Sequence, residues 1–185
     1  MPPTLKTDRL TLRSLRLSDA GRVQALCGEI AISRWLSRVP HPYPDGEAER
    51  FITQCLDEAC QVWGIEIIER PGIVGCIGLE GPSDHTILGY WLGQSYWGRG
   101  LVTEAAREAV RFGFDQMGRD VLRSGLFQGN ARSLRIQQKL GFQIKGRRKM
   151  YCKALNRELE HIDTELTRAD WEAAQLIGMG GTQDA

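Results

Sequence analysis

The spacing of apolar residues changes period several times along the chain, and each change marks an expected element. Residues 9–15 alternate like a strand, and Ser18 is placed to cap a helix that extends to about Cys27. A second helical stretch at residues 30–36 ends before a cluster of prolines. From Asp45 to Cys60, apolar residues recur every three or four positions, which predicts an amphipathic helix.

The remainder of the chain intersperses strands with helices. Strands at residues 62–69 and 73–79 flank Arg70-Pro71-Gly72, which is typical of a hairpin turn. The pattern further predicts a strand at 87–92, a helix at 101–117, a strand at 121–127, a short helix at 130–141, and strands at 143–151 and 160–166, the last at an edge of the sheet. This order predicts an α/β fold with a mixed sheet.

Length and composition indicate one domain, residues 1–177, followed by a glycine-rich segment, residues 178–185, that we expect to be a flexible tail. The 24 Lys and Arg residues nearly balance the 23 Asp and Glu residues, so neither nucleic acid nor an anionic membrane is expected as a partner. No apolar run approaches the roughly 18 residues of a membrane span, and the N-terminus lacks the apolar core of a signal peptide. We therefore expect a cytoplasmic protein, either a monomer or a homodimer.

Cysteine and histidine spacing gives no sign of a metal or a disulfide framework. The five cysteines are odd in number and contain no Cys-x-x-Cys pair, and the three histidines are scattered. We expect no metal site.

The turn after the strand at 87–92 carries two glycines, Gly98 and Gly100, and leads into a helix. Glycine permits a positive φ and a close approach of the backbone to a ligand. The free N–H groups and the dipole at the start of the following helix favour an anion. The turn therefore indicates a phosphate site, although glycine in a strand-to-helix turn also serves geometry alone.

A short helix about thirty residues later has Asn130 as a candidate N-cap and Gly141 as a candidate C-terminal glycine. With it, the chain resembles the GNAT superfamily of acetyl-CoA-dependent N-acetyltransferases, and within it the branch that acetylates ribosomal-protein N-termini and related amines. The segments that carry the resemblance are Leu10-Thr11-Leu12-Arg13 with Ser18-Asp19-Ala20, Gly89-Tyr90-Trp91-Leu92-Gly93, Tyr96-Trp97-Gly98-Arg99-Gly100 with Thr103-Glu104-Ala105, and residues 130–142.

The resemblance implies a single-domain fold with a mixed, mostly antiparallel sheet, flanking helices and a central strand pair that splays apart. It implies acetyl transfer from acetyl-CoA to a primary amine, such as a protein N-terminal α-amine, by direct attack in a ternary complex. The exposed backbone of Trp91, Leu92 and Gly93 is expected to bond the pantetheine arm, and an N–H near Leu92 to polarise the acetyl carbonyl.

The resemblance also assigns side chains. The residues expected to hold the pyrophosphate are Trp97, Gly98, Arg99, Gly100, Leu101, Val102 and Thr103. Asn130 is expected to bond the cofactor arm, and Ser133 to lie in the cofactor site and act as the general acid. Two simpler roles stay open, namely a helix cap for Asn130 and a backbone-bonding helical residue for Ser133.

The chain departs from the family pattern at two places. Val102 stands where a small residue is usual, and its β-branched side chain resists unusual backbone angles. The glutamate that some relatives use as a base falls near Cys152 and Lys153, where no carboxylate stands. Glu80 and Glu66 are the candidate substitutes, with a solvent-exposed role for Glu66 and a chain of water molecules as the alternatives.

The acceptor is not determined by these motifs. In the family it is selected by segments that correspond here to Trp35 to Tyr43 and Gly81 to Thr86. A protein α-amine, a free amino acid, a polyamine and an aminoglycoside all remain candidates. Two rival functions are a catalytically silent acyl-CoA-binding regulatory module, and a nucleotide-binding protein, against which the turn lacks both the P-loop and the dinucleotide glycine patterns.

Overall fold

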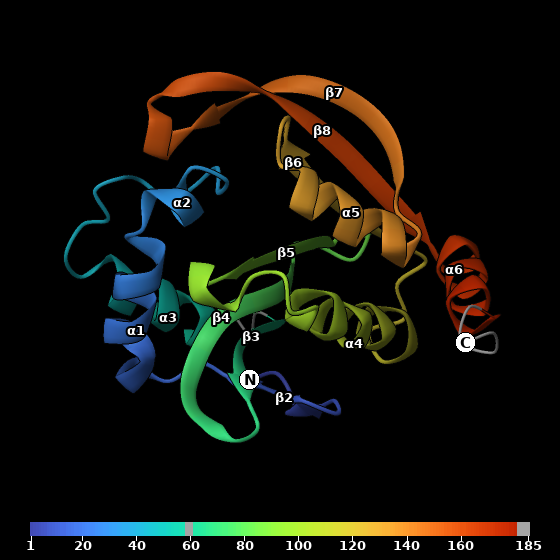
Figure 1. The fold of residues 1–185 in the computed structure, drawn as a ribbon, viewed down its shortest axis with the longest axis horizontal. Coiled ribbons are helices and arrows are strands. Elements are labelled where there is room, and N and C mark those ends of the chain that lie inside the picture. The colour runs from blue at the N-terminus through green and yellow to red at the C-terminus, as the bar shows by residue number, and fades with distance from the viewer. Residues whose placement is uncertain (58–60, 181–185) are drawn as a thin grey trace.

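The structure is a computed structural model that describes residues 1–57 and 61–180, and in these residues eight strands form one sheet (Figure 1). The strands are β1 (Leu5–Lys6), β2 (Leu10–Ser14), β3 (Gln61–Ile67), β4 (Arg70–Glu80), β5 (Ile87–Leu92), β6 (Val121–Phe127), β7 (Gln143–Cys152) and β8 (Arg157–Thr167). The helices are α1 (Ala20–Cys27), α2 (Ile30–Ser33), α3 (Glu47–Asp57), α4 (Leu101–Asp115), α5 (Ala131–Leu140) and α6 (Arg168–Gly180).

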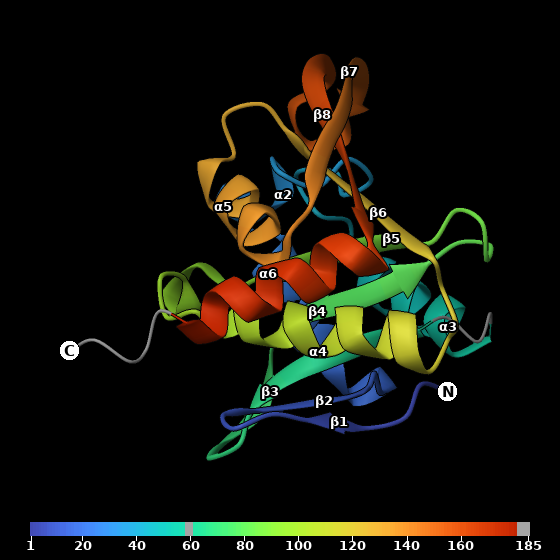
Figure 2. The same cartoon turned by 90° about the vertical axis from the view of Figure 1, so that its right-hand side faces the viewer.

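The sheet order is β1-β2-β3-β4-β5-β6-β8-β7. Figure 2 shows the β1–β2 ribbon at the bottom of the molecule and the β7–β8 pair at the top, which are the two ends of this order. Every neighbouring pair is antiparallel except β5 and β6, which are parallel and share the single register pair Ile87–Arg123. Beyond that pair the two strands diverge, and we call this diverging segment the fork. The predicted mixed, mostly antiparallel sheet with a splayed central pair is confirmed.

The two faces of the sheet carry separate apolar clusters. On one, the α4/α5 face, Leu88 and Leu92 pack with Ala105 and Ala109 of α4. On the other, the α1/α3 face, Cys76 of β4 packs in a cluster with residues of α1 and α3, and Trp91 of β5 lies partly buried against that cluster. Because side chains alternate along a strand, Tyr90 shares the α4/α5 face with Leu88 and Leu92. The chain therefore sends neighbouring residues of β5 to opposite sides of the fork.

Most expected elements occur close to their predicted positions, and the strand at 121–127 and the helix between Asn130 and Gly141 match residue for residue. The helix expected to run to Cys60 is described to Asp57, since residues 58–60 lie outside the described residues. Asn130 accepts the Ser133 N–H at 3.2 Å, and Gly141 adopts a φ of 96°, so both predicted ends of that helix are confirmed.

Three local predictions are wrong. Ser18 does not cap a helix, because the Asp19 carboxylate accepts the Arg16 N–H at 2.8 Å and takes that role in the short 3-10 turn Leu17–Asp19. The β3–β4 hairpin does not turn at Arg70-Pro71-Gly72, since Ile67 already pairs with Arg70 and the reversal falls at residues 68–69. Strand β8 is not an edge, because it pairs with β6 on one side and β7 on the other.

The C-terminal region contains a helix that the apolar pattern did not predict. Helix α6 runs from Arg168 to Gly180 and buries Trp171 in the core. Its last three residues belong to the segment expected to be a flexible tail, and residues 181–185 lie outside the described residues.

Candidate active site

The turn between β5 and α4 has a backbone suited to holding an anion. Gly98 and Gly100 have φ angles of 74° and 75°, in the left-handed region where glycine is favoured. Gly100 is the N-cap of α4, and the first bond within the helix runs from the Glu104 N–H to the Gly100 carbonyl at 3.1 Å. The N–H groups before it, at residues 101–103, have no acceptor within the helix. These groups include that of Val102, whose half-buried side chain fits the first helical turn.

Trp97 fastens this turn to the end of β5. Its indole N–H donates to the Leu92 carbonyl at 2.7 Å. Its ring also lies beneath the guanidinium of Arg132, whose Cζ is 4.7 Å from the ring centroid. Arg132 is in the first turn of α5, two residues after Asn130, so α5 brings a second cation beside Arg99 to the turn. The sequence pattern alone did not single out Arg132, although its place after the cap residue is a usable signal.

A second tether comes from the turn between β1 and β2. Arg9 donates through Nη1 to the Arg99 carbonyl at 3.1 Å. Glu104, in the first turn of α4, accepts from the Thr7 hydroxyl at 2.5 Å, the Arg9 N–H at 3.0 Å and the Arg9 Nε at 2.7 Å. We call Thr7, Arg9 and Glu104 the Arg9 clamp. Burial tends to raise the pKa of the Glu104 carboxyl, but the bonds from Thr7 and Arg9 outweigh it and lower that pKa.

The ladder between β4 and β5 decides which backbone groups face the fork. The Gly93 N–H donates to the Val74 carbonyl at 2.8 Å. Because bonded and non-bonded pairs alternate along an antiparallel ladder, Trp91 also bonds to β4, whereas the N–H and C=O groups of Tyr90 and Leu92 point into the fork. Of the three residues expected to supply free backbone there, Leu92 supplies a donor N–H, while the N–H groups of Trp91 and Gly93 serve the ladder.

A pair of hydroxyl groups lies on the α4/α5 face beside this backbone. The Tyr90 hydroxyl is 2.8 Å from the Ser133 Oγ. Ser133 is buried in the first turn of α5, where its N–H donates to the Asn130 side chain. Burial raises the pKa of the Tyr90 phenol although the bond from Ser133 opposes it, so the phenol stays protonated at neutral pH. Tyr90 was not predicted as a site residue, because its contact with α5 follows from sheet register rather than from a motif.

A buried polar chain links the two strands where the fork begins. The Ser124 hydroxyl of β6 donates to the Leu88 carbonyl of β5 at 2.9 Å. Gln137 of α5 donates to Ser124 at 3.0 Å and accepts from the Thr164 hydroxyl of β8 at 2.7 Å. All three side chains are buried, and each has a hydrogen-bond partner. This network of hydrogen bonds therefore fixes β5, β6, β8 and α5 relative to one another.

The two carboxylates considered as bases lie elsewhere. Glu80 stands opposite Ile87, where β5 begins, and binds Arg38 at 2.9 Å. Five strand residues, or about 16 Å, separate Ile87 from Leu92 at the other end of β5. Glu66 binds Arg13 at 2.7 Å in a cluster between β2 and β3. Glu80 is thus paired with Arg38 at the opposite end of β5 from Leu92, and Glu66 is paired with Arg13.

Among residues 1–57 and 61–180, no three His, Cys, Asp or Glu side chains gather in a group that could hold a metal ion. No helix in this part of the chain has the length and apolar character needed to cross a membrane.

Taken in order along the α4/α5 face, the groups suit an elongated phosphorylated thioester. The glycine turn offers N–H donors and cations for phosphates, and the open edge of β5 offers N–H and C=O groups for a polar arm. The Leu92 N–H points into the fork, and the protonated hydroxyl pair lies on the α4/α5 face of the same strand. This arrangement can stabilise a developing oxyanion and supply a proton to a leaving group.

Comparison with known proteins gives the same outline. A model of the acetyltransferase (GNAT) domain family matches residues 9–143. The chain is 27% identical over 178 residues to the [ribosomal protein uS5]-alanine N-acetyltransferase of Escherichia coli (strain K12), covering 90% of this chain and 92% of that protein. It is 24% identical over 165 residues to an uncharacterized N-acetyltransferase, p20, of Bacillus licheniformis, covering 85% and 92% respectively.

Solved structures share the fold at low sequence identity. A GNAT-family acetyltransferase from Bacillus anthracis superposes with a TM-score of 0.78 at 17% identity, over 89% of this chain and 98% of that chain. A ribosomal-protein-S5-alanine acetyltransferase from Vibrio fischeri superposes with a TM-score of 0.74 at 18% identity, over 91% and 98%.

Proposed function

Since the chain belongs to the GNAT acetyltransferase family and is an acetyltransferase enzyme, we propose that it moves the acetyl group of acetyl-CoA to a primary amine by direct attack in a ternary complex. The observation that carries the proposal is the fork. There the free Leu92 N–H, the Tyr90–Ser133 hydroxyl pair and the glycine turn all lie along one face of the sheet.

The thioester of acetyl-CoA supplies the activated acetyl group. Turn residues Trp97 to Thr103 and Arg132 hold the phosphates, while the Leu92 N–H donates to the carbonyl oxygen as charge develops on it. The Tyr90 hydroxyl and the Ser133 Oγ share a hydrogen bond, and when the phenol is its donor the Ser133 hydroxyl hydrogen is free for the departing sulfur. Asn130 keeps Ser133 in place by capping α5, whether or not it also bonds the cofactor arm.

The first acceptor class to test is the α-amine of a protein that begins with alanine. Two proteins similar to this chain carry the name of ribosomal-protein-alanine acetyltransferases, one from Escherichia coli and one from Vibrio fischeri. The acceptor is therefore proposed by similarity, whereas the acetyl donor is proposed from the turn and the fork.

Calorimetry tests the donor. We expect micromolar binding of acetyl-CoA, and no comparable binding of ATP or NAD, by the purified protein. Gly100→Asp should abolish binding, because it places a carboxylate and a strained residue in the phosphate turn. Gly118→Asp is the matched control, since Gly118 also has a positive φ of 62° and open space around it but lies beyond the far end of α4. Equal loss in both variants, or no acetyl-CoA binding by the wild type, would contradict the proposal.

Thiol release tests the transfer. We expect free CoA to appear with an alanine-initiated peptide but not with the same peptide blocked at its α-amine, and mass spectrometry should place the acetyl group on that amine. Transfer to a lysine side chain or to a polyamine instead would support the proposed acetyl transfer but overturn the proposed class of acceptor. Binding without thiol release on any amine would favour a silent acyl-CoA-binding module.

A further inference from the structure

The two faces of β5 separate the leaving group from the approaching amine. Ser133 and Tyr90, which serve the sulfur in the proposed function, lie on the α4/α5 face. Trp91 and Gly89 point to the α1/α3 face, because side-chain positions alternate along the strand. The acetyl carbon lies beyond the sulfur at the end of the cofactor arm, so an amine that adds to its open carbonyl face, away from that arm, approaches across the α1/α3 face. A base for the amine must stand on that side of the fork.

Space is available on that side. An added Cβ at Gly89 would meet no atom within 4 Å. Counting two residues on from the register pair Ile87–Arg123 puts Gly89 and Gly125 at the same level on the two diverging strands. Gly89 thus leaves room above the β5 backbone where the amine would arrive, and the face of β6 beside it is covered by the ring described next.

His161 of β8 borders this space. An ideal Cβ at Gly125 would lie 2.9 Å from the His161 Nε2, so the ring extends from β8 across β6 in the direction of β5. Phe127, which pairs with His161 in the sheet, holds the ring edge-to-face at a centroid distance of 5.5 Å. The glycine at 125 is required by this packing, because any side chain there would displace the imidazole.

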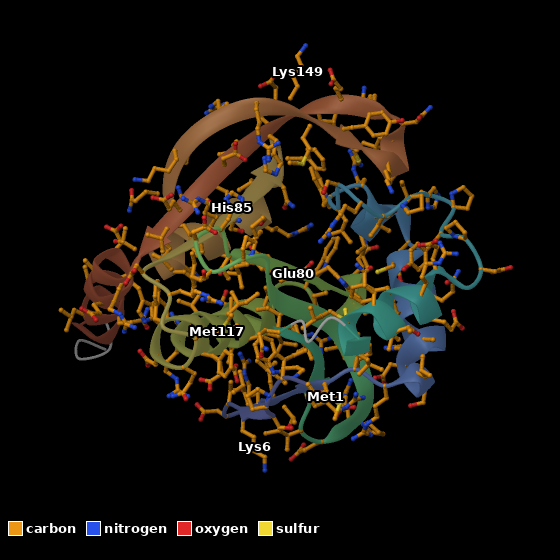
Figure 3. The ribbon with its side chains drawn as sticks, turned by 180° about the vertical axis from the view of Figure 1, so that it is seen from behind. Met1, Lys6, Glu80, His85, Met117 and Lys149 are labelled. Carbon is orange, nitrogen blue, oxygen red and sulfur yellow. The ribbon has the colours of Figure 1, made fainter. Side chains whose placement is uncertain are left out.

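The face of the β7–β8 pair on which His161 lies is consistent with this position of the ring. Figure 3 shows Lys149 pointing outward from the top of the β7–β8 arch. Lys149 pairs with Glu160, and the next pair along the ribbon is Arg148 with His161. Side chains of successive pairs point to opposite faces, so Arg148 and His161 point to the underside of the arch.

The Asp163 carboxylate determines which nitrogen of the His161 ring carries the proton. This carboxylate is 2.9 Å from the His161 Nδ1 and also binds Arg148 at 2.9 Å. A carboxylate only accepts, so Nδ1 carries the proton and Nε2 presents its lone pair. Burial lowers the pKa of His161, with Arg148 acting in the same direction and Asp163 against it, so the ring is neutral at neutral pH. The β6 residues packed on the ring, Gly125 and Phe127, carry no charge.

Resting on the proposed acetyl transfer, we propose that His161 is the general base for the acceptor amine and that Asp163 is its positioning residue. As the amine nitrogen forms its bond to the acetyl carbon, His161 Nε2 takes one proton from that nitrogen. The C–S bond breaks, its electron pair leaves with sulfur, and the Ser133 hydroxyl supplies the proton that yields free CoA. Water then returns a proton to Ser133 and takes the proton held by His161. A base on β8 explains why Glu80 and Glu66, the two candidate carboxylates, need not take part.

The experiment measures kcat/KM against pH with the alanine-initiated peptide, together with acetyl-CoA affinity and thermal stability. We expect an acidic limb in the wild type, with activity rising as His161 loses its proton. His161→Gln should lower kcat/KM about 100-fold and remove the limb, with unchanged acetyl-CoA affinity. Asp163→Asn should shift the limb to lower pH, because the carboxylate raises the pKa of the ring. Glu160→Gln, an exposed neighbour on the other side of the ribbon, is the matched control and should match the wild type.

The outcomes separate the two claims. Wild-type turnover with a His161→Gln variant that keeps its rate and its acidic limb would overturn the base and leave the acetyl transfer standing. An NMR titration in which His161 stays protonated at neutral pH would also overturn it. A wild type that neither binds acetyl-CoA nor releases thiol would overturn the proposed function, and the base with it.

Discussion

The shared hydrogen bond between Tyr90 and Ser133 joins a strand to a helix through two protonated oxygens. Burial keeps the phenol protonated, so both oxygens carry a proton and either can donate to the other. The serine can then serve as a proton donor without being acidic itself. The backbone around it is rigid, since the Asn130 cap fixes the first turn of α5.

Removing either hydroxyl tests this pair. Ser133→Ala should lower kcat about 100-fold, because a positioned proton donor is lost, and Tyr90→Phe should lower it less, because the serine remains. Calorimetry should give unchanged acetyl-CoA affinity for both variants. Tyr151→Phe, at an exposed tyrosine of β7, is the control. A Ser133→Ala enzyme with wild-type kcat would show that the sulfur leaves without this donor.

A second residue-scale device is the buried pair Arg13–Asp19, which fixes the start of α1 against β2. The guanidinium binds both Asp19 oxygens at 2.8 Å and also reaches Glu66. Burial tends to raise the pKa of the Asp19 carboxyl, but the bonds from Arg13 and from the Arg16 N–H outweigh it and lower that pKa. The folded state therefore favours the ionised carboxylate.

Asp19→Asn should lower the free energy of unfolding by about 3 kcal/mol at neutral pH, because it leaves a buried guanidinium with one partner fewer. A depressed folded-state pKa contributes stability above the unfolded value, about 3.9, and that contribution is lost as pH falls through the folded value. Urea unfolding at neutral pH and at about pH 3 should show the gap between wild type and variant narrowing in acid. A gap that widens in acid would contradict this assignment.

Among the elements, the β1–β2 turn has a role beyond the sheet edge. Through the Arg9 clamp it holds the Arg99 carbonyl and neutralises Glu104, a carboxylate placed at the end of α4 that faces the phosphate turn. A residue about ninety positions away in the sequence thus shapes the anion site. The Arg9 side chain is exposed, so its contribution comes from orientation more than from charge.

Arg9→Ala should weaken acetyl-CoA binding about tenfold, equivalent to about 1.4 kcal/mol, because the turn loses a tether and Glu104 is left unpaired. Adding Glu104→Gln should restore part of the affinity by removing that charge. Calorimetry measures both, with Lys6→Ala, an exposed cation on β1, as the control. Equal acetyl-CoA affinity in Arg9→Ala and the wild type would show that the Arg9 clamp does not contribute to acetyl-CoA binding.

The elements also show which features a sequence can predict. Strand β6 and helix α5 matched because alternation, Asn130 and Gly141 are local signals. Helix α6 was missed because the glycines near its end resemble a tail, whereas Trp171 is ordered by packing on β8 and α5. Tyr90 and His161 were missed as site residues because their contacts depend on strand register, which no single segment encodes.

At the scale of the whole molecule, two lobes of the sheet meet at one register pair, Ile87–Arg123. The junction is reinforced by α5 and by α6 beyond it. Trp171 of α6 joins the cluster that contains Leu140 and Leu166, and α6 approaches Gly141 so closely that an added Cβ there would lie 2.7 Å from the Asp170 carbonyl oxygen. The C-terminal helix therefore supports the lobe that carries Ser133.

Trp171→Ala should lower the free energy of unfolding by about 3 kcal/mol, because it leaves a cavity beneath α5. Leu176→Ala, on the same helix at a side chain that is 73% exposed, should change it by less than about 0.5 kcal/mol. Urea denaturation followed by circular dichroism measures both. Equal effects from the two substitutions would mean that α6 is held by something other than Trp171.

The position of Trp97 gives the molecule an optical reporter of its own site. The indole N–H is bound to the Leu92 carbonyl and the ring face lies beneath Arg132, so its fluorescence depends on the very groups that a phosphate would draw away. Trp63 and Trp171 are buried in the core, while Trp35 and Trp91 lie outside the phosphate turn. The part of the emission that Trp97→Phe removes therefore follows occupancy at the phosphate turn, while a thiol reagent follows the release of CoA.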